Sequence, residues 1–526
     1  METIKLWARN GDAVRRAIEL GELAHLDTAS EELTDEFLLF ALQSGLLSKW
    51  AEAFPDPRQE PEIGMEVILP AHMAARFAGL YSMRKAGYVL RSARVLGALG
   101  YSVEVIEPAH GLSLRGTADD QLFSGDVVRK LLVKMETQAD LSQPARLPPP
   151  EASVRVKGRE RASRRAVKQT VDTAEAEARA HKVAEQWVHW YNQHVGLSMV
   201  QYARLGQGRR IHILDTPHIE VPLETGTYEC SGVVKNDDGT YGRGYKLATV
   251  RTLLDNAGVL SQVALAAIQV HDVALCRPLL EMPPVLRAGD LVLEDRGFID
   301  GATVSDLKRR RQVDVIIPLK ANMLATQEAI QLAERAAQWA AHPSRAAQHI
   351  AFVRGVEHMW NECEVPRNAC VIRFWNKKKK KTDHIVLVTS DLELNASWIV
   401  RHYEERPEIE QDYEQMKSGG WQLQKLSSTR YSEIVFYVLT AVLRYRLYPL
   451  FANTQAGVRF ADKTRQAIAF EQLRTHRTHI IVYAGGYFEI FETLSFVQMV
   501  LHLSPPVQEQ LRTWLAVHLK KVQKRE

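Results

Sequence analysis

Residues 403–417, YEERPEIEQDYEQMK, contain four polar side chains at helical spacing, namely Tyr403, Arg406, Glu410 and Lys417. At 3.6 residues per turn, their offsets of 0, 3, 7 and 14 project within roughly 60° of one another. One helical face would therefore carry a phenol, a guanidinium, a carboxylate and an ammonium group, although an exposed stripe of salt bridges would use the same spacing. Pro407 cannot donate a mid-helix hydrogen bond, so we expect a kink or a new helix at this position.

Two aspartates upstream follow short β-rich runs. Asp215 ends the run IHIL (211–214), and Asp295 ends LVLE (291–294) and precedes a turn that begins at Arg296. Strand ends lie at the edge of a sheet, where open α/β sheets usually bind ligands. Either aspartate alone could instead be a turn or helix cap. Asp237 or Asp238, in a stretch that we interpret as a hairpin turn, is the alternative to Asp215.

These residues together resemble the DDE transposases of bacterial insertion sequences, in the branch with the Y-R-E-K signature. The pattern Y-x2-R-x3-E-x6-K runs from Tyr403 to Lys417, Asp215 lies in ILDTP, and Asp295 lies in EDRGF. VIIPLK (315–320) and SSTRYSEI (427–434) are also similar to family sequences, so that the resemblance covers about residues 190–450. It implies an α/β fold with an RNase H-like core and a β-rich insertion between the second aspartate and the glutamate.

The resemblance also implies a metal-dependent active site. Asp215, Asp295 and Glu410 would be the catalytic residues and the ligands of two Mg²⁺ (or Mn²⁺) ions, with Asp215 bridging both ions. Hard carboxylate oxygens suit these ions, which activate an oxygen nucleophile and neutralise charge at the phosphorus. Three carboxylates gathered without a cation would repel one another. No covalent enzyme intermediate is required.

The same resemblance, together with local charge, predicts DNA-binding residues. Beside the active site they are Tyr403, Arg406, Lys417 and Arg296. In the basic run that follows a proline-rich segment they are Arg164 and Arg165, and within five consecutive lysines (377–381) they are Lys378 and Lys379. Trp360 and Trp375, with Phe374, are candidates for stacking on a flipped base. Solvated basic segments and core aromatic residues are the alternatives. His271-Asp272 is a candidate for a supporting role.

The composition along the chain suggests six regions. We expect a helical N-terminal region for DNA binding and end recognition (1–140), a proline-rich and basic linker (141–175), the first part of the core (176–344), a β-rich insertion (345–392), the second part of the core (393–455) and a helical C-terminal region, a candidate for dimerisation (456–526). The protein would act on the inverted repeats at transposon ends and on target DNA, as a homodimer or a higher assembly.

The bulk composition excludes few classes. The chain has 526 residues, 46% hydrophobic and 25% charged, with a net charge of only +4, so DNA binding cannot be argued from the total. Its four cysteines include no C-x-x-C pair. METIKLWARNGD lacks the pattern of a signal peptide, and the apolar run 434–442 is too short to span a bilayer. We therefore expect a cytoplasmic, nucleoid-associated bacterial protein without a membrane partner.

Three functions fit these observations. The first is an active transposase. The second is an RNase H-like, metal-dependent nuclease without strand transfer, which would need neither the long N-terminal region nor the insertion. The third is a non-catalytic DNA-binding descendant, against which the presence of all three acids argues. Terminal inverted repeats around the gene would favour the first.

Overall fold

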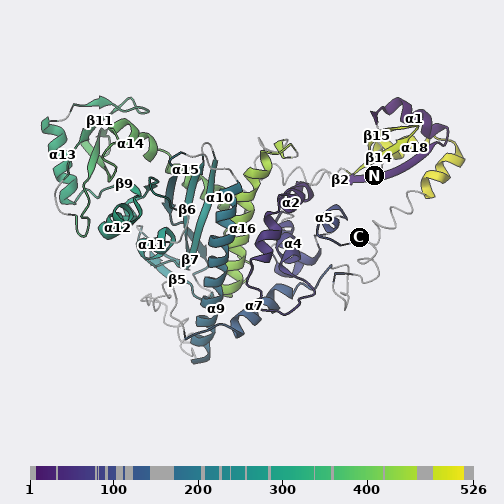
Figure 1. Cartoon of the computed structure of the whole chain (residues 1–526), viewed down its shortest axis with the longest axis horizontal. Helices are drawn as coiled ribbons and strands as arrows, with labels where there is room; N and C mark the ends of the chain where they lie inside the picture. Colours follow the sequence, from purple (N-terminus) through teal and green to yellow (C-terminus); the bar gives the residue numbers. More distant parts are fainter. Residues whose placement is uncertain are drawn as a thin grey trace. The chain divides into compact units, whose positions relative to one another are not determined.

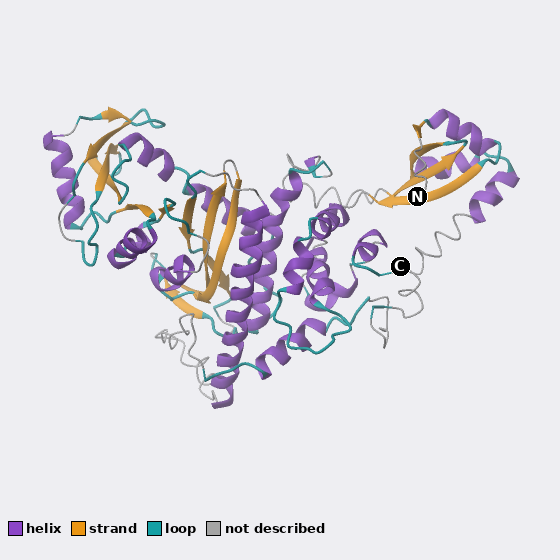
Figure 2. Ribbon diagram, viewed as in Figure 1, coloured by secondary structure: helices purple, strands orange, loops and turns teal. Residues whose placement is uncertain are grey.

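The computed structural model describes residues 8–30, 33–77, 80, 82–88, 90, 93–101, 111–112, 122–142, 171–202, 208–223, 228–236, 238–254, 257–281, 286–336, 338–356, 360–418, 421–455, 457–458 and 478–513. The chain divides into two compact units (Figures 1 and 2). Unit 1 comprises residues 1–45, 61–127 and 451–526, and unit 2 comprises residues 46–60 and 128–450. All the residues of the predicted catalytic site belong to unit 2.

A mixed sheet forms the centre of unit 2. Five of its strands lie side by side in the spatial order β7 (Ala257–Ala267), β6 (Tyr241–Leu254), β3 (Ile211–Asp215), β8 (Leu291–Leu293) and β9 (Asp314–Pro318). Strand β6 is antiparallel to β7 and β3, whereas β3, β8 and β9 are parallel to one another. The short strands β4 (His218–Val221) and β5 (Gly232–Lys235) also pair with β6. The prediction of an α/β fold with a mixed sheet is confirmed.

The β-rich block predicted at 345–392 extends this same sheet. Strands β11 (Gln348–Val353), β12 (Asn368–Asn376) and β13 (Lys381–Thr389) form an antiparallel meander, and β13 pairs with β9. The two-residue strand β10 (Ala340–Ala341) lies at the edge. Helices α13 (Leu324–Ala336) and α14 (Ala396–Tyr403) pack on these strands. Residues 377–380, four of the five consecutive lysines, form the turn between β12 and β13 and are the tip of a β-hairpin.

Helices cover the other end of the sheet, at strand β7. Helix α9 (Val171–Trp190), the π-helix η2 (Tyr191–Gly196) and α10 (Leu197–Tyr202) all contact β7 (Figure 1). Helix α16 (Tyr431–Ala452) runs along the same strand, where Tyr431 donates a hydrogen bond to the carbonyl of Leu265 and Arg446 donates one to the carbonyl of Gly258. Within the described residues, α16 alone is long and apolar enough to cross a membrane, but most of it is buried, as in a core helix.

A side chain of the π-helix η2 provides hydrogen-bond partners for backbone groups at the unpaired edge of β7. The Asn192 amide accepts a hydrogen bond from the Val263 N–H (2.8 Å) and donates one to the Val263 carbonyl (2.9 Å). This pair of bonds replaces the neighbouring strand that β7 lacks on this side, in keeping with the need to pair buried backbone groups. The close approach depends on Gly196, where a Cβ atom would lie 2.0 Å from the Ser261 carbonyl oxygen.

We expect Gly196→Ala to lower the free energy of unfolding by about 1–3 kcal/mol, because the added methyl group forces η2 away from β7. Urea unfolding followed by circular dichroism measures the change. Gly208→Ala is the matched control, because a Cβ atom there meets no atom within 4 Å. Equal stability of the two variants would show that the contact between η2 and β7 is not tight in solution.

The two ends of the chain form a four-stranded sheet in unit 1. The strand order is β1 (Ala8–Arg9), β15 (Tyr487–Glu492), β14 (Thr478–Ala484) and β2 (Leu23–Ser30). Helices α1 (Gly11–Glu19) and α18 (Thr493–Leu501) pack on it through a core that includes Val14, Ile18, Val482, Phe491 and Phe496. The prediction of helical N-terminal and C-terminal regions is therefore wrong for these segments.

The physical reason lies in pairing across the sequence. The turn Gly485-Gly486 has both φ angles positive (57° and 82°), which is the backbone that a two-residue β-hairpin requires. Strand β14 of this hairpin pairs with β2 from the other end of the chain. Elsewhere in unit 1 the expected helices are present, including α2 (Leu33–Gln43), α4 (Met65–Phe77) and α5 (Ala93–Ala98).

Candidate active site

The parallel strands β3 and β8 bring two aspartates to one edge of the sheet. Ile213 of β3 is in register with Leu293 of β8. Two residues farther along, Asp215 and Asp295 are therefore at the same level on neighbouring strands, where both chains leave the sheet. Asp295 also caps the short 3-10 helix η3 (Arg296–Phe298), since its Oδ1 accepts a hydrogen bond from the Arg296 N–H (2.6 Å).

Glu410 comes from helix α15 (Pro407–Ser418), which begins at Pro407. The preceding helix α14 ends at Tyr403, and residues 404–406 form a turn. The expected new helix at Pro407 is thus present, whereas the single helical face drawn through all four signature residues is wrong, because the chain bends between Tyr403 and Pro407. Proline fits the first turn of a helix, where its missing N–H has no partner to lose.

The guanidinium group of Arg406 joins all three predicted catalytic acids. Its Nη2 lies 3.0 Å from Asp295 Oδ2 and 3.8 Å from Asp215 Oδ1, and its Nη1 lies 2.8 Å from Glu410 Oε1. The side chains of Asp215, Asp295 and Glu410 are 20%, 41% and 56% exposed, so that one acid lies deep and two face solvent. The structure brings Asp215, Asp295, Glu410 and Arg406 into one cluster.

Burial changes the acidity of several groups in this cluster. Burial raises the pKa of Asp215 to about 6, against the opposing effect of Arg406, and the charges of Glu410 and Asp295 raise it further. Burial also raises the pKa of Tyr403, which keeps this residue a neutral phenol. The pKa of Lys417 is lowered by burial, while Glu220 and Asp215 act in the opposite direction. The site is therefore a partly desolvated cluster of carboxylates with cationic groups beside it.

The donor chemistry of this cluster fits a divalent cation. Each of the three carboxylates already pairs with one shared positive group, and hard oxygen ligands are those that Mg²⁺ and Mn²⁺ prefer. Within the described part of the chain, no three acidic, histidine or cysteine side chains lie close enough together to hold a metal as they stand. The Arg406 guanidinium lies between the acids, so these residues fit a metal once that side chain has moved.

A second layer of contacts steadies the strand ends. The Asp272 Oδ1 accepts hydrogen bonds from Thr216 Oγ1 (2.8 Å), next to Asp215, and from the nearly buried Lys246 Nζ (2.7 Å). A Cβ atom on Gly297, two residues after Asp295, would lie 3.0 Å from the other Asp272 oxygen. Asp272 therefore hydrogen-bonds the residue that follows Asp215 and lies against the turn that follows Asp295, while a supporting role for His271-Asp272 stays a prediction.

Helix α15 is held by residues that the sequence analysis did not single out. Asp412 is buried and contacts Arg251 of β6 (3.0 Å), Arg446 of α16 and the Tyr445 hydroxyl (2.7 Å). On the next residue, the Tyr413 hydroxyl contacts Thr249 and lies 3.4 Å from the Asp215 carbonyl oxygen. The sequence shows that Asp412 and Tyr413 lie close to Glu410. It does not reveal their contacts, because the residues that they contact lie 33 to 198 positions away.

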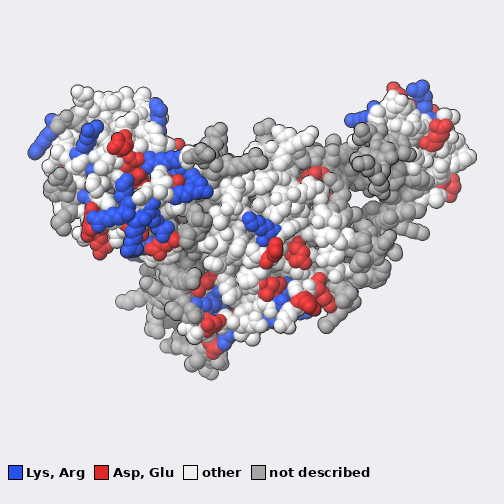
Figure 3. Space-filling model, viewed as in Figure 1, with Lys and Arg blue, Asp and Glu red and all other residues white. Residues whose placement is uncertain are grey.

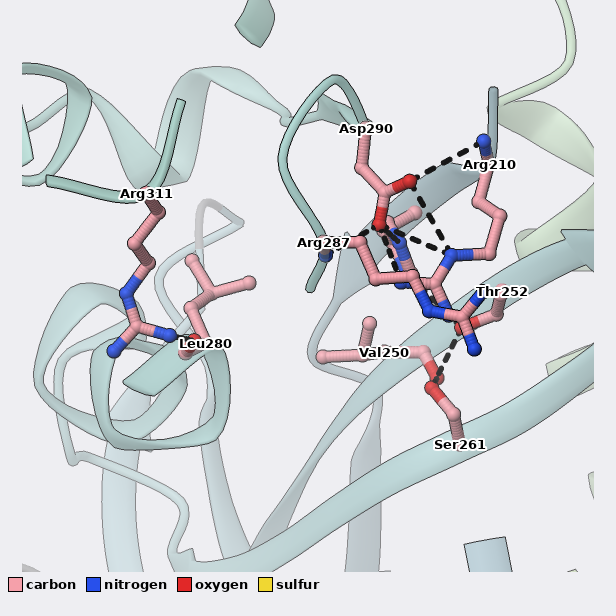
Figure 4. Close-up of polar contacts among 9 residues, drawn as sticks. Arg210, Val250, Thr252, Ser261, Leu280, Arg287, Asp290 and Arg311 are labelled. Atoms are coloured by element: carbon pink, nitrogen blue, oxygen red, sulfur yellow. Dashed lines mark hydrogen bonds and ion pairs between the residues drawn. The ribbon is translucent and has the colours of Figure 1, made fainter. Parts of the chain in front are cut away.

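The opposite ends of β3 and β8 are joined by Asp290 (Figure 4). Its carboxylate accepts hydrogen bonds from Arg210 Nη2 (2.7 Å) and from the Arg287 N–H (2.8 Å), and it lies 3.0 Å from His212 Nε2. His212 in turn contacts Thr252 of β6. Burial alone would raise the pKa of Asp290, but the hydrogen bonds from His212 and Arg210 outweigh it and lower the pKa to about 2. Asp290 thereby fixes the register that places Asp215 beside Asp295.

We expect Asp290→Asn to lower the free energy of unfolding by about 2–3 kcal/mol at pH 7. Because the pKa of Asp290 is depressed in the folded state, its contribution is complete above the unfolded pKa of about 4 and is lost as the pH falls toward 2. Chemical denaturation from pH 7 to pH 2.5 should therefore show the two proteins converging below pH 4. A difference that stays constant over this range would contradict the assignment.

The remaining DNA-binding candidates are distributed unevenly. Arg296 is exposed beside Asp295, and Lys417 is half-buried on α15. Lys378 and Lys379 are exposed on the hairpin turn, where Lys379 pairs with Asp383. Arg164 and Arg165 lie outside the described residues.

The two tryptophan candidates differ in exposure. Trp375 is 60% exposed and available for stacking, whereas Trp360 is only 7% exposed and packs in the interior. The ring of Trp360 therefore cannot stack on a base in this conformation. The alternative to Asp215 also has an ordinary role, because Asp238 Oδ1 accepts a hydrogen bond from the Thr240 N–H in the expected hairpin turn. Asp237 lies outside the described residues.

Basic residues also gather over the region of α12 (Gly301–Arg311), whose last turn is Lys308-Arg309-Arg310-Arg311 (Figure 3). Most of these charges have acidic partners. Lys308 Nζ lies 2.6 Å from Asp314 Oδ1, Arg310 Nε lies 2.9 Å from Asp306 Oδ1, and Arg309 pairs with Glu364. We therefore do not include α12 in the candidate site.

Comparison with known protein families agrees with this geometry. Residues 206–447 match the family described as the transposase DDE domain. The matched segment contains Asp215, Asp295 and Glu410, and it also contains Arg406 and Lys417. A search of curated proteins found no match.

Proposed function

Because residues 206–447 belong to the transposase DDE domain family, we propose that this protein is a DNA transposase that binds the ends of an insertion sequence and performs metal-dependent strand cleavage and strand transfer. The observation that carries the proposal is the convergence of Asp215, Asp295 and Glu410 on one cationic group. These acids come from two strand ends and a helix far apart in sequence. Their convergence favours a reaction centre over separate structural caps.

We further assign the five strands β7-β6-β3-β8-β9 to an RNase H-like core. Two features support this assignment. Strands β7, β6 and β3 follow one another in antiparallel order, and β8 and β9 continue the sheet parallel to β3. The acids also lie at the end of β3, which is the first of these five strands along the chain, just after the neighbouring parallel strand β8, and on helix α15, which contacts β3.

Asp215, Asp295 and Glu410 would hold the divalent metal, Mg²⁺ or Mn²⁺, in two ions per site. When bound, such ions supply charge neutralisation at the phosphate and a more acidic attacking hydroxyl group. The chain's own groups bind and orient the DNA. Arg296 is exposed beside Asp295 and suits a phosphate contact, whereas the raised pKa of Tyr403 leaves its hydroxyl group able to donate a hydrogen bond.

The partners follow from the reaction. A transposase must hold two transposon ends and a target, which favours a homodimer or a higher assembly on paired ends. We place the recognition of transposon ends in the N-terminal region. Lys378 and Lys379, on an exposed and strongly basic hairpin turn, would contact the phosphate backbone of the DNA. Contacts with phosphates release counterions, so this binding should weaken as the salt concentration rises.

The test uses the full-length protein, Mg²⁺ and labelled DNA that carries the terminal inverted repeats flanking the gene, with a supercoiled plasmid as the target. Breaks at the end boundary and covalent joining of the labelled end to the plasmid are the expected products. Breaks without joining would favour the nuclease without strand transfer. Specific binding to paired ends without any break, with both Mg²⁺ and Mn²⁺, would favour the non-catalytic DNA-binding descendant.

A further inference from the structure

The Arg406 guanidinium occupies the centre of the acidic cluster, where a shared metal would be expected. We propose that Arg406 is a positioning residue that acts as an internal counter-ion: it holds the three carboxylates together without metal and competes with metal until DNA phosphate draws it away. This inference rests on the proposed function, because it assumes that the three acids are metal ligands. It assigns to Arg406 a second role beyond contact with DNA.

The first support is the geometry of the contacts. One side chain reaches three acids that come from three different elements, with contacts of 3.0 Å to Asp295, 2.8 Å to Glu410 and 3.8 Å to Asp215. The Arg406 side chain is only 12% exposed, so the guanidinium group lies among the acids and largely away from water, although Asp295 and Glu410 face solvent. A carboxylate cluster without a cation would repel itself, and this guanidinium removes part of that repulsion.

The second support is that the arrangement does not satisfy Arg406 fully. Its Nε atom is buried and has no hydrogen-bond partner among the described residues. An unsatisfied buried donor destabilises the arrangement, which lowers the free energy needed for the side chain to leave. Arg406 also lies in the turn between α14 and α15, with its N–H donating to the Tyr403 carbonyl. The Arg406 backbone is therefore outside α15, the helix that carries Glu410.

The neighbouring cations do not share this role. Arg296 follows Asp295 directly, yet it is exposed, and no ion pair joins it to the three acids within the described residues. Lys417 is half-buried on α15. The charge of Asp215 acts on it at a distance, without an ion pair between the two side chains in the described part of the chain. Among these three basic residues, Arg406 alone lies where it must compete with a metal ion. Linkage then requires that DNA, by binding the guanidinium, strengthens metal binding, and that metal strengthens DNA binding to the same extent.

The test measures the binding of Mn²⁺ alone to the full-length protein, through the electron paramagnetic resonance signal of the free ion. Arg406→Gln should bind Mn²⁺ about tenfold more tightly than the parent protein without DNA, a change within the usual range of coupling between sites. Arg296→Gln removes the same charge one residue from Asp295 and should change the dissociation constant by less than about twofold, because exposed charges are screened. Addition of a duplex with the transposon end should tighten Mn²⁺ binding to the parent and have little effect on Arg406→Gln.

The possible outcomes distinguish failure of the inference from failure of the proposed function. If Arg406→Gln binds Mn²⁺ equally or more weakly, the counter-ion role is wrong, and the metal-dependent function is unaffected. If no protein binds Mn²⁺ at millimolar concentration, with or without DNA, the proposed metal site fails and the inference fails with it. Near-UV circular dichroism checks that Arg406→Gln is folded. If it is not, Arg406→Lys, which keeps the charge but loses the planar fork, should give a smaller increase in affinity, and an unchanged affinity would overturn the inference.

Discussion

Asp295→Asn is expected to lower the rate of cleavage at the transposon end by about a thousandfold or more, because under the proposed function it removes one of three metal ligands and with it several kcal/mol of transition-state stabilisation. The free energy of unfolding should change by less than about 1 kcal/mol. The Asp295 side chain is 41% exposed, and its local structural role is to cap η3. Asparagine caps helices as well as aspartate does, so the substitution removes the charge and keeps the fold.

The measurement is a single-turnover cleavage assay on pre-bound DNA ends, with binding checked by electrophoretic mobility shift. Asp300→Asn is the matched control, because Asp300 also caps a helix, α12, through the Thr303 N–H. Within the described residues, Asp300 has no hydrogen bond or ion pair with Asp215, Glu410 or Arg406, and we expect Asp300→Asn to cleave at the parental rate. Cleavage by Asp295→Asn at more than a tenth of the parental rate would remove Asp295 from the site.

Much of the candidate site could be predicted from the sequence because its geometry is local. Short apolar runs that end in aspartate place Asp215 and Asp295 at strand ends, and the proline after Arg406 fixes the start of the helix that carries Glu410. The parallel pairing of β3 and β8 then sets the two aspartates side by side. A resemblance to transposases at the same positions added the chemistry, and the match of residues 206–447 to the transposase DDE domain agrees with it.

What could not be predicted depends on contacts between distant parts of the chain. The sheet formed by β2 and β14 joins segments about 450 residues apart, and its hairpin was interpreted as helical because local propensity does not reveal a distant partner. Trp360 was a candidate for stacking on a base, but its side chain is buried, and burial is a tertiary property. The position of Arg406 among three acids likewise requires three elements to meet, and sequence spacing shows only its link to Glu410.

Helix α15 depends on one buried acid, and its loss should have the largest effect on stability. Asp412 is 7% exposed and lies between Arg251, which is 7% exposed, and Arg446, which is 4% exposed. The Tyr445 hydroxyl also donates a hydrogen bond to it. We expect Asp412→Asn to lower the free energy of unfolding by about 3–5 kcal/mol, because two buried guanidinium groups lose their shared counter-charge. Chemical denaturation of the metal-free protein measures this change.

The control for Asp412 is Glu414→Gln on the exposed side of the same helix, which should change stability by less than about 0.5 kcal/mol. Because Asp412 lies two residues after Glu410, the variant should also weaken Mn²⁺ binding at temperatures where it is still folded, through displacement of α15 from β6. A folded Asp412→Asn protein with parental stability would show that the two arginines find other partners. Parental Mn²⁺ affinity in a destabilised variant would show instead that the first turn of α15, where Pro407 begins the helix, holds Glu410 in place without the buried ion pairs farther along.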